Sequence, residues 1–335
     1  MAIDIGGGET GLLAWMLKRN VLKNVNQLLV NFHGITTDIS QSVYVEHLMI
    51  LSDLYTEGFR TFHFQRKLNC IFKEDKGKTG CYSIYMIRRM PMTGPLEVYG
   101  PDLIENKTST DLAFMYSSLL ISSQVHCKEL VRLGKVSDGG WDVCNDTKYR
   151  LSSPCLVYSF GIDNDWSFDD DISTTFGCET HSFDPSMGML DHQRSKKITF
   201  HNIGLWGKPR GLKGTWTMMN LKEIIDMLGH TGKIIDILKM DIEWAEWEAI
   251  PNMLATGVLR NVRQLFVEFH GSPGPDSSLL SRLTSLRGIY DQGFKLFWSH
   301  PNVVGDNPKI FSVTGREVSG CYENYFLNTN LINLK

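Results

Sequence analysis

The 335-residue sequence lacks several features that would assign it to a common class of protein. It has no apolar run of the roughly 18 to 20 residues that a membrane-spanning helix needs, so we predict no membrane segment in this chain. Residues 1–20 contain Asp4, Glu9 and consecutive glycines in place of a basic start and an apolar core, so no signal peptide is visible. The chain as given is predicted to be soluble. Sequence upstream of Met1 would show whether a leader or a missing half-domain precedes it, so we leave the compartment open.

An excess of positive charge is also lacking. The chain has 34 lysines and arginines against 37 aspartates and glutamates, which gives a net charge of −3. Such a balance provides no broad attraction to phosphate backbones, so nucleic acid is not a predicted partner. The hydrophobic content of 42% is ordinary for a globular protein, and the length predicts about two domains.

The seven cysteines show no CxxC spacing. This argues against a cysteine-based zinc site and against a dense disulfide framework. Cys144 and Cys155 flank a short loop and would be able to pair in an exported protein. The alternative is that they are buried free thiols.

What the sequence does contain is an imperfect internal repeat. Residues 3–34 resemble residues 234–271, and roughly half of the aligned positions from Asp4 and Asp241 onward are identical, which indicates duplication of part of a domain. The first copy keeps His33 for His270 but has Asn31 for Glu268 and glycines for Glu243 and Trp244. We therefore predict a degenerate half-domain without a complete site at 1–90, a linker at 91–109 and a complete domain at 110–330.

Strand-like and helix-like segments alternate within the complete domain. Residues 110–133 have the spacing of an amphipathic helix, and apolar strand-like runs follow at 155–162, 178–184, 197–205, 233–241 and 262–270, with helical segments between them. This alternation predicts an α/β fold with a doubly wound, mainly parallel sheet of the Rossmann type. Ligands of such sheets bind at the carboxyl ends of the strands. The strand ends carry these candidates: Gly161, Asp163, Asp184, Asn202, Gly204, Asp241, Glu268 and His270.

The loop after the first of these strands reads SFGIDNDWSFDD and has one glycine in place of GxGxxG. A dinucleotide, and with it a nucleotide-linked oxidoreductase, is therefore disfavoured. The neighbouring carboxylates would repel phosphate, so an adenosine cofactor without phosphate, S-adenosylmethionine, fits better. Asp184 ends the second strand, where a carboxylate would bind the ribose hydroxyls. Its alternative role is to cap the turn before Pro185.

Four segments in this order, YSFGIDNDWSFDDD, HSFDPSMG, HNIGLWG and DILKMDIEWAEWEAIP, resemble the methyltransferase domain of the animal methyltransferase-like protein 24 group, itself related to FkbM-type methyltransferases. The resemblance covers residues 110–330 fully and residues 2–88 only as a repeated C-terminal half. It implies a class I S-adenosylmethionine-dependent methyltransferase that O-methylates a carbohydrate or another small-molecule hydroxyl. It also implies that Ser159, Phe160, Gly161 and Asp163 lie under the methionine moiety, Asp184 on the ribose, Asn202 and Gly204 beside the adenine, and Asp241 at the reaction centre.

The chemistry of the last strand ends leaves alternatives open. Asp241, Glu268 and His270 are the predicted catalytic residues, because methyl transfer to a hydroxyl needs a base beside the incoming oxygen. They would also suit a divalent metal, although we predict no metal site from the sequence. His270 could instead be structural, because the first copy keeps it as His33. A rival for the whole chain is a non-catalytic pseudo-methyltransferase that acts as a binding or scaffold protein.

Overall fold

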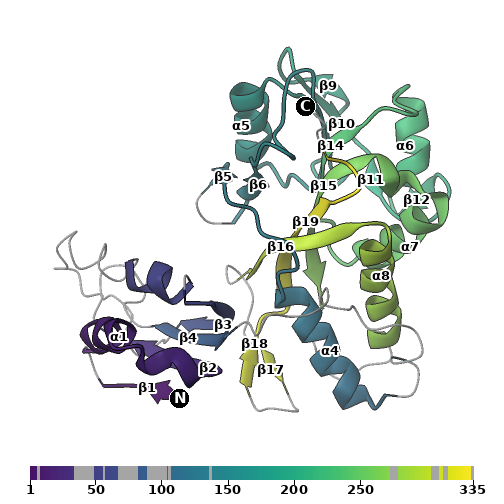
Figure 1. The fold of residues 1–335 in the computed structure, drawn as a ribbon. Helices are drawn as coiled ribbons and strands as arrows, with labels where there is room; N and C mark the ends of the chain where they lie inside the picture. Colours follow the sequence, from purple (N-terminus) through teal and green to yellow (C-terminus); the bar gives the residue numbers. More distant parts are fainter. Residues whose placement is uncertain are drawn as a thin grey trace. The chain divides into compact units, whose positions relative to one another are not determined.

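The computed structural model describes residues 1–5, 8–33, 49–55, 57–66, 82–88, 104, 107–135, 138–271, 278–302, 309–311 and 316–332. The chain divides into two compact units, Met1–Leu96 and Glu97–Lys335, and each has its own hydrophobic core (Figure 1). None of the helices among these residues combines the length and the apolar character needed to cross a bilayer.

The second unit is built on an eight-stranded sheet. The strands lie in the order β16 (Phe294–Pro301), β19 (Cys321–Asn328), β15 (Val262–His270), β14 (Ile235–Met240), β7 (Leu156–Phe160), β8 (Glu179–Phe183), β10 (Ile198–His201) and β9 (His192–Gln193). The five strands from β15 to β10 are parallel, whereas β19 is antiparallel to both of its neighbours and β9 is antiparallel to β10. The chain runs from β7 outward to β10 and then returns to β14 on the other side of β7. The sheet is therefore doubly wound, with its switch point between β7 and β14.

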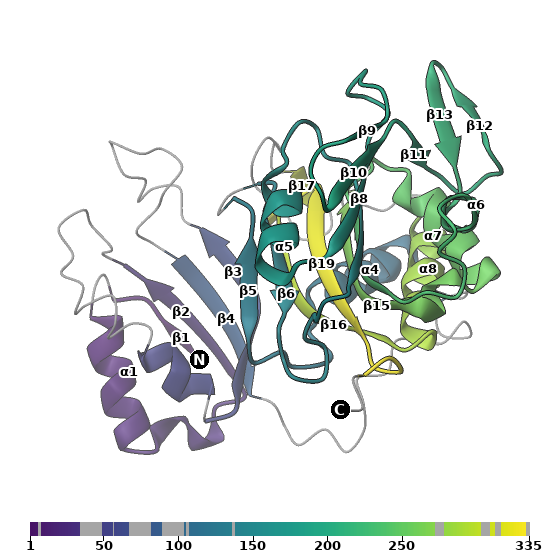
Figure 2. The ribbon, with the colours of Figure 1, turned by 90° about the horizontal axis from the view of Figure 1, so that it is seen from above.

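Burial on both faces explains the continuous apolar sequences of these central strands. Every residue of β7 and of β14 is buried. Helices α4 (Ser109–Ile121), α6 (Leu221–Met227), α7 (Glu246–Thr256) and α8 (Leu279–Asp291) cover one face, and α5 (Ser167–Phe176) covers the other together with the hairpin of β5 (Leu130–Leu133) and β6 (Trp141–Cys144) (Figure 2). Because side chains alternate along a strand, Tyr158 packs in the first core and Val157 in the second.

Two short sheets complete the second unit. A three-stranded sheet of β11 (Gly204–Leu205), β12 (Gly211–Lys213) and β13 (Trp216–Met219) lies between β10 and α6 in the sequence, and β17 (Lys309–Phe311) pairs with β18 (Arg316–Val318). The strand predicted at 197–205 is therefore divided, because β10 ends at His201 and β11 pairs with β13 instead of with β8.

The prediction of one helix over residues 110–133 was wrong in its second half. Helix α4 begins at a capping box of Thr108 and Asp111 and ends at Ile121. The amide groups of Gln124 and Val125 then donate to the carbonyl oxygen of Leu296, at 2.7 and 3.1 Å. These bonds to β16 take the chain away from the helix, and β5 begins at Leu130.

Both sequence-based interpretations of Cys144 and Cys155 were also wrong. Cys144 forms a disulfide with Cys127, and Cys155 forms one with Cys178. The bridges close segments with sequence separations of 17 and 23 residues. The first ties the segment before β5 to the end of β6, and the second ties the segments that lead into β7 and β8.

The first unit is a smaller sheet with the order β1 (Ala2–Ile3), β2 (Gln27–Phe32), β4 (Tyr82–Arg88) and β3 (Phe59–Arg66). Helix α1 (Glu9–Lys18) and a 3-10 turn, η1 (Val21–Asn24), connect β1 to β2, as α7 and η3 (Val258–Asn261) connect β14 to β15. Strands β14, β15, β19 and β16 follow the same order with the same parallel and antiparallel pairings.

The register of the two sheets also corresponds. Phe32 is opposite Tyr82 as Phe269 is opposite Tyr322, and an irregularity follows Thr61 in β3 as it follows Leu296 in β16. A common origin for the two segments stays a prediction. The matched register allows corresponding residues to be compared one by one.

Candidate active site

The switch point of the large sheet brings the ends of β7 and β14 into contact. The amide of Asp241 donates to the carbonyl oxygen of Phe160 at 3.1 Å, and the amide of Gly161 donates to that of Phe183 at 2.9 Å. Gly161 has a φ of +75°, and a Cβ atom at this position would lie 1.6 Å from the carbonyl oxygen of Asp241. Only glycine fits between the two strand ends, which explains the single glycine of the loop.

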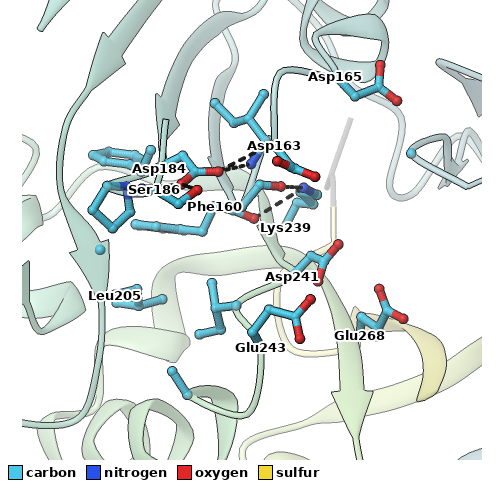
Figure 3. Close-up of a pocket in the computed structure, with 18 of the residues that line it drawn as sticks. Phe160, Asp163, Asp165, Asp184, Ser186, Leu205, Lys239, Asp241, Glu243 and Glu268 are labelled. Atoms are coloured by element: carbon cyan, nitrogen blue, oxygen red, sulfur yellow. Dashed lines mark hydrogen bonds between the residues drawn. The ribbon is translucent and has the colours of Figure 1, made fainter. Parts of the chain in front are cut away.

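A cavity of about 900 Å³ opens at this edge of the sheet (Figure 3). This volume suits a ligand of cofactor size, since such sites commonly span about 300 to 1,000 Å³. Eight of the residues predicted for the site line the cavity: Phe160, Gly161, Asp163, Asp184, Gly204, Asp241, Glu268 and His270. The ends of the strands therefore predicted the position of the cavity, and the roles of these residues stay predictions.

The other two predicted residues do not belong to the cavity lining. Ser159 is fully buried below it, where its hydroxyl donates to the carboxylate of Asp169 at 3.3 Å. Asn202 uses its backbone amide to bond Asp191 at the edge of the sheet. The partner of Ser159, Asp169 of α5, does line the cavity, and it also accepts a hydrogen bond from Ser182. Burial raises the pKa of Asp169 to about 6.

The carboxylate of Asp184 caps the turn after β8, which is the alternative role considered for it, and also binds the loop after β7, whereas its contact with a ribose stays a prediction. One oxygen accepts from the amides of Ile162 and Asp163 at 3.0 and 2.9 Å. The other accepts from the amide and hydroxyl of Ser186 at 2.8 and 2.6 Å (Figure 3). The side chain is 5% exposed and lines the cavity. Asp184 thus holds the loop after β7 against the turn after β8.

A buried lysine on β14 lies opposite this loop, and the sequence-based reasoning missed it. The ammonium group of Lys239 donates to the carbonyl oxygens of Phe160 and Gly161 at 3.2 and 2.5 Å (Figure 3). It is also 5.3 Å from the ring centre of Trp141. The available signal was a lysine within a strand buried on both faces, where lysine is rarely found.

Asp241 and Glu268 form a carboxyl pair at the ends of β14 and β15. The two carboxyl groups are close enough for the charge of one to act on the other. Burial and the negative charge of Asp241 raise the pKa of Glu268 to about 8, and burial also raises the pKa of Asp241. The amide of Asn302 donates to Glu268 at 3.0 Å. The raised pKa of Glu268 favours its protonated form at neutral pH.

His270 is held by a carboxylate that was not among the predicted residues. Glu246, fully buried in the first turn of α7, accepts from the backbone amide of His270 at 2.7 Å and lies 3.2 Å from its Nδ1 atom. Burial favours the neutral imidazole, but hydrogen bonds to Cys321 and Glu246 outweigh it and raise the pKa of His270. A protonated ring is a donor and a charge partner, so His270 is poorly suited to accept a proton.

The first unit has the same pair. Nδ1 of His33 lies 2.9 Å from the carboxylate of Glu9, the counterpart of Glu246. The pairing therefore occurs beside Asn31 as well as beside Glu268, which favours a structural role for the histidine.

The turn between β14 and α7 has an unusual backbone. Glu243 and Trp244 have φ angles of +49° and +74°, in the left-handed region that residues with a Cβ rarely adopt. The side chain of Glu243 lines the cavity and lies 3.4 Å from Nε2 of His270. Non-glycine residues in this conformation cluster at functional sites. The first copy has glycines at the two corresponding positions.

The two tryptophans of this segment, Trp244 and Trp247, differ in their surroundings. Trp247 packs against the ring of Phe269 at 4.8 Å and donates from its indole nitrogen to the carbonyl of His270 at 2.7 Å. Trp244 is half exposed. Neither is among the residues that line the cavity.

The cavity also contains groups that could hold a divalent cation. Ligand atoms of Asp241, Glu243 and His270 lie within 4.8 Å of one another, and so do those of Glu268, His270 and Cys321. The protonated carboxyl pair and the Glu246 contact of His270 account for these groups without an ion. A metal at this position stays a hypothesis.

Comparison with known proteins assigns the class. Residues 76–313 match a family model described as a methyltransferase domain. The match spans more than half of the chain, and the chain therefore belongs to this methyltransferase-domain family.

Two individual relatives show which members of the family the chain resembles. The chain is 27% identical to human "Probable methyltransferase-like protein 24" over 240 residues, which are 65% of this chain and 64% of the human protein. It is 27% identical to the rat protein of that name over 231 residues, 62% of each. The chain thus spans less than two thirds of the length of these relatives. The resemblance to the methyltransferase-like protein 24 group is confirmed.

Solved structures of phosphoethanolamine N-methyltransferase 2 from Haemonchus contortus are more distant. The complex with S-adenosyl-L-methionine is 11% identical, with a TM-score of 0.26 over 82% of this chain and 63% of that chain. The complex with phosphomonomethylethanolamine and S-adenosylhomocysteine is 9% identical, with a TM-score of 0.20 over 82% and 62%. TM-scores this low do not establish a shared fold.

Proposed function

We propose that the second unit binds S-adenosylmethionine in the cavity at the switch point and transfers its methyl group to a hydroxyl of a carbohydrate or another small molecule. The observation that carries the proposal is the position of the cavity. It opens where the chain leaves the ends of β7 and β14, next to the loop whose single glycine, Gly161, has no space for a side chain. Membership of the methyltransferase-domain family supports the same function.

The charge of the cavity fits this cofactor. Eight carboxylates line it, namely Asp138, Asp163, Asp165, Asp169, Asp184, Asp241, Glu243 and Glu268, against Lys135, Lys213, Lys239 and His270. An excess of carboxylates repels a pyrophosphate and attracts a cation. S-adenosylmethionine supplies a methyl group on a positively charged sulfur, from which an incoming oxygen can take it.

The residues of the chain would supply orientation and a proton acceptor. Lys239 and Asp184 hold the loop of residues 161–163 from opposite sides and so fix the floor of the cavity. The Asp241 and Glu268 pair can accept the proton that a hydroxyl loses as its oxygen is methylated. His270, held by Glu246, would place a positive charge beside this pair. We therefore assign proton transfer to the carboxyl pair and orientation to His270.

The side chain of Glu243 is the best candidate for contact with the acceptor. It is 81% exposed at the mouth of the cavity and stands on a left-handed backbone. A carboxylate in this position can accept hydrogen bonds from the hydroxyl groups of a sugar or a similar polyol.

Calorimetry with S-adenosylhomocysteine tests the proposal directly. The whole chain should bind one molecule, and residues 105–335 alone should bind it with the same affinity, because every lining residue of the cavity belongs to the second unit. Failure of both proteins to bind would leave the non-catalytic scaffold as the better account. A large loss on truncation alone would show that the first unit contributes to the site.

A further inference from the structure

A second cluster of titratable side chains lies away from the cavity. His181 on β8, His201 at the end of β10 and His230 after α6 are all buried, at 7, 7 and 5% exposure. None of the three lines the cavity. They occupy the same sheet face as Tyr158, whose ring lies 5.6 Å from that of His181 and 5.9 Å from that of His230. The function proposed above gives these histidines no role.

Three groups of this cluster converge. Nε2 of His181 lies 3.2 Å from the carboxylate of Glu179, and ligand atoms of Glu179, His181 and His230 all lie within 4.8 Å of one another. The two imidazole rings have centres 5.1 Å apart and planes inclined by 74°. Two imidazole nitrogens and a carboxylate oxygen thus lie close enough together to be considered as ligands of one ion.

The opposite nitrogen of each ring is already fixed by a partner. Nδ1 of His181 lies 2.9 Å from Nε2 of His201, and Nδ1 of His230 lies 2.8 Å from the hydroxyl of Tyr158. Nδ1 of His201 lies 3.7 Å from the carboxylate of Asp191. If each Nδ1 carries the hydrogen, His181 donates to His201, His201 points its hydrogen toward Asp191, and Nε2 of both His181 and His230 keeps a lone pair for an ion. Metal-binding histidines are commonly oriented in this way by a partner on the other ring nitrogen.

We propose that Glu179, His181 and His230 bind a divalent transition metal, with Zn²⁺ as the ion that two imidazoles and one carboxylate suit best. Two histidines and a glutamate are an established ligand set for zinc, with a fourth position left to water. The side chain of Glu179 is 58% exposed, so an ion can enter from solvent. Bound there, it would join the start of β8 to the loop after α6.

The competing account is a cluster held by hydrogen bonds alone. In that case Nε2 of His181 carries the hydrogen and donates it to Glu179, while His201 donates to His181. The two accounts differ in what happens when Glu179 loses its charge. A metal loses a ligand, whereas a hydrogen bond to an amide oxygen persists.

The test uses the whole chain, stripped with a chelator and titrated with Zn²⁺ alone. Zinc content and melting temperature would be measured for the wild type, Glu179→Gln and His230→Gln, with His192→Gln as the control. Nδ1 of His192 lies 2.8 Å from the backbone carbonyl oxygen of Leu190, and His192 does not belong to the proposed ligand set. Two other groups of possible zinc ligands also lie close together, namely Asp4, Glu9 and His33, and Asp241, Glu243 and His270. The test therefore depends on the difference in zinc content between each variant and the wild type, and not on the total zinc content.

We expect each ligand variant to bind one zinc ion fewer than the wild type, to bind the remaining zinc unchanged and to lose the zinc-dependent rise in melting temperature. The control should match the wild type. Titration with Co²⁺ should give a visible absorption band that Glu179→Gln removes. Glu179 is exposed, so this variant should fold even if His230→Gln does not. Wild-type zinc content in Glu179→Gln, or no zinc bound to the wild type, would overturn the proposal.

Discussion

Nδ2 of Asn31 donates a hydrogen bond of 2.6 Å to Oδ2 of Asp4, at the positions that correspond to Glu268 and Asp241. Oδ1 of the same amide accepts from the hydroxyl of Ser83. An amide makes both contacts without titrating, whereas Glu268 at the corresponding position is a buried acid beside the charge of Asp241. The first unit therefore shows that the backbone accepts a neutral side chain here, and the acid of the second unit is not required for the fold.

Glu268→Gln should keep the size and shape of the side chain and remove a group whose pKa is raised to about 8. The folded-state pKa of Glu268 lies above the unfolded value, so its stabilising contribution is present below about pH 4.5 and is lost as pH rises through 8. The variant should be roughly 2 kcal/mol more stable than the wild type at pH 8 and similar at pH 4. Urea unfolding at both pH values measures this.

The exposed Glu129→Gln serves as the control for loss of a carboxylate and should show no such difference. Methyl transfer by Glu268→Gln should fall by at least about 100-fold, because a general base contributes on that order. A stability difference between the variant and the wild type that does not grow from pH 4 to pH 8 would contradict the raised pKa of Glu268.

Glu243→Gly should leave the fold intact and reduce methyl transfer. Glycine adopts a φ of +49° freely, so the relief of strain, about 1 kcal/mol, offsets the greater freedom of the unfolded chain. The matched control is Glu248→Gly, which places the same change on the ordinary helical backbone of α7 and should cost about 1 kcal/mol. Equal destabilisation of the two variants in urea would show that the turn is not strained. Unchanged turnover of an identified acceptor would remove Glu243 from the site.

Gly161→Ala should abolish binding of S-adenosylhomocysteine. The added methyl group would meet the carbonyl oxygen of Asp241 at 1.6 Å, which forces the ends of β7 and β14 apart. Gly232→Ala is the control, because Gly232 has a φ of +80° and no atom near the position of a Cβ. It should cost about 1 to 2 kcal/mol in stability and leave binding unchanged. Calorimetry of both variants separates backbone strain from the steric clash.

The two disulfides should be detectable in protein purified without reductant. Intact mass should be lower by four hydrogens than that of the reduced chain, and alkylation before reduction should spare Cys127, Cys144, Cys155 and Cys178. Replacing Cys127 and Cys144 by serine should cost about 3 kcal/mol, the loop-closure value for a segment of this length. Because such bridges persist in oxidising surroundings, we expect the chain to mature in an oxidising compartment. Full alkylation of the native protein would rule this out.

Strand ends could be predicted from the sequence because a strand buried on both faces has a continuous apolar sequence. The apolar runs that precede Asp184 and Asp241 correspond to β8 and β14, and both carboxylates line the cavity. Helix α5 likewise begins at Ser167 and ends before Gly177, as its acidic first turn and glycine indicate. These features depend on neighbouring residues alone.

The remaining features depend on partners that are distant in the sequence. Helix α4 ends where amides of Gln124 and Val125 find Leu296, more than a hundred residues away. Glu246 could not be distinguished from the other acidic residues of its helix until the fold placed it under His270. The partners of Cys144 and Cys155 were undetermined for the same reason, because spacing alone does not fix connectivity.

All the hydrogen-bond acceptor positions of the Asp184 carboxylate are engaged by Ile162, Asp163 and Ser186. A ribose hydroxyl that binds this carboxylate must therefore displace one of these donors, and the displaced amide or hydroxyl must find another acceptor. Arrival of the cofactor would then proceed in two kinetic stages, a fast encounter followed by a slower exchange of hydrogen bonds. Departure of the spent cofactor would restore the original contacts, and these contacts would lower the affinity for the spent cofactor because they compete for the same carboxylate.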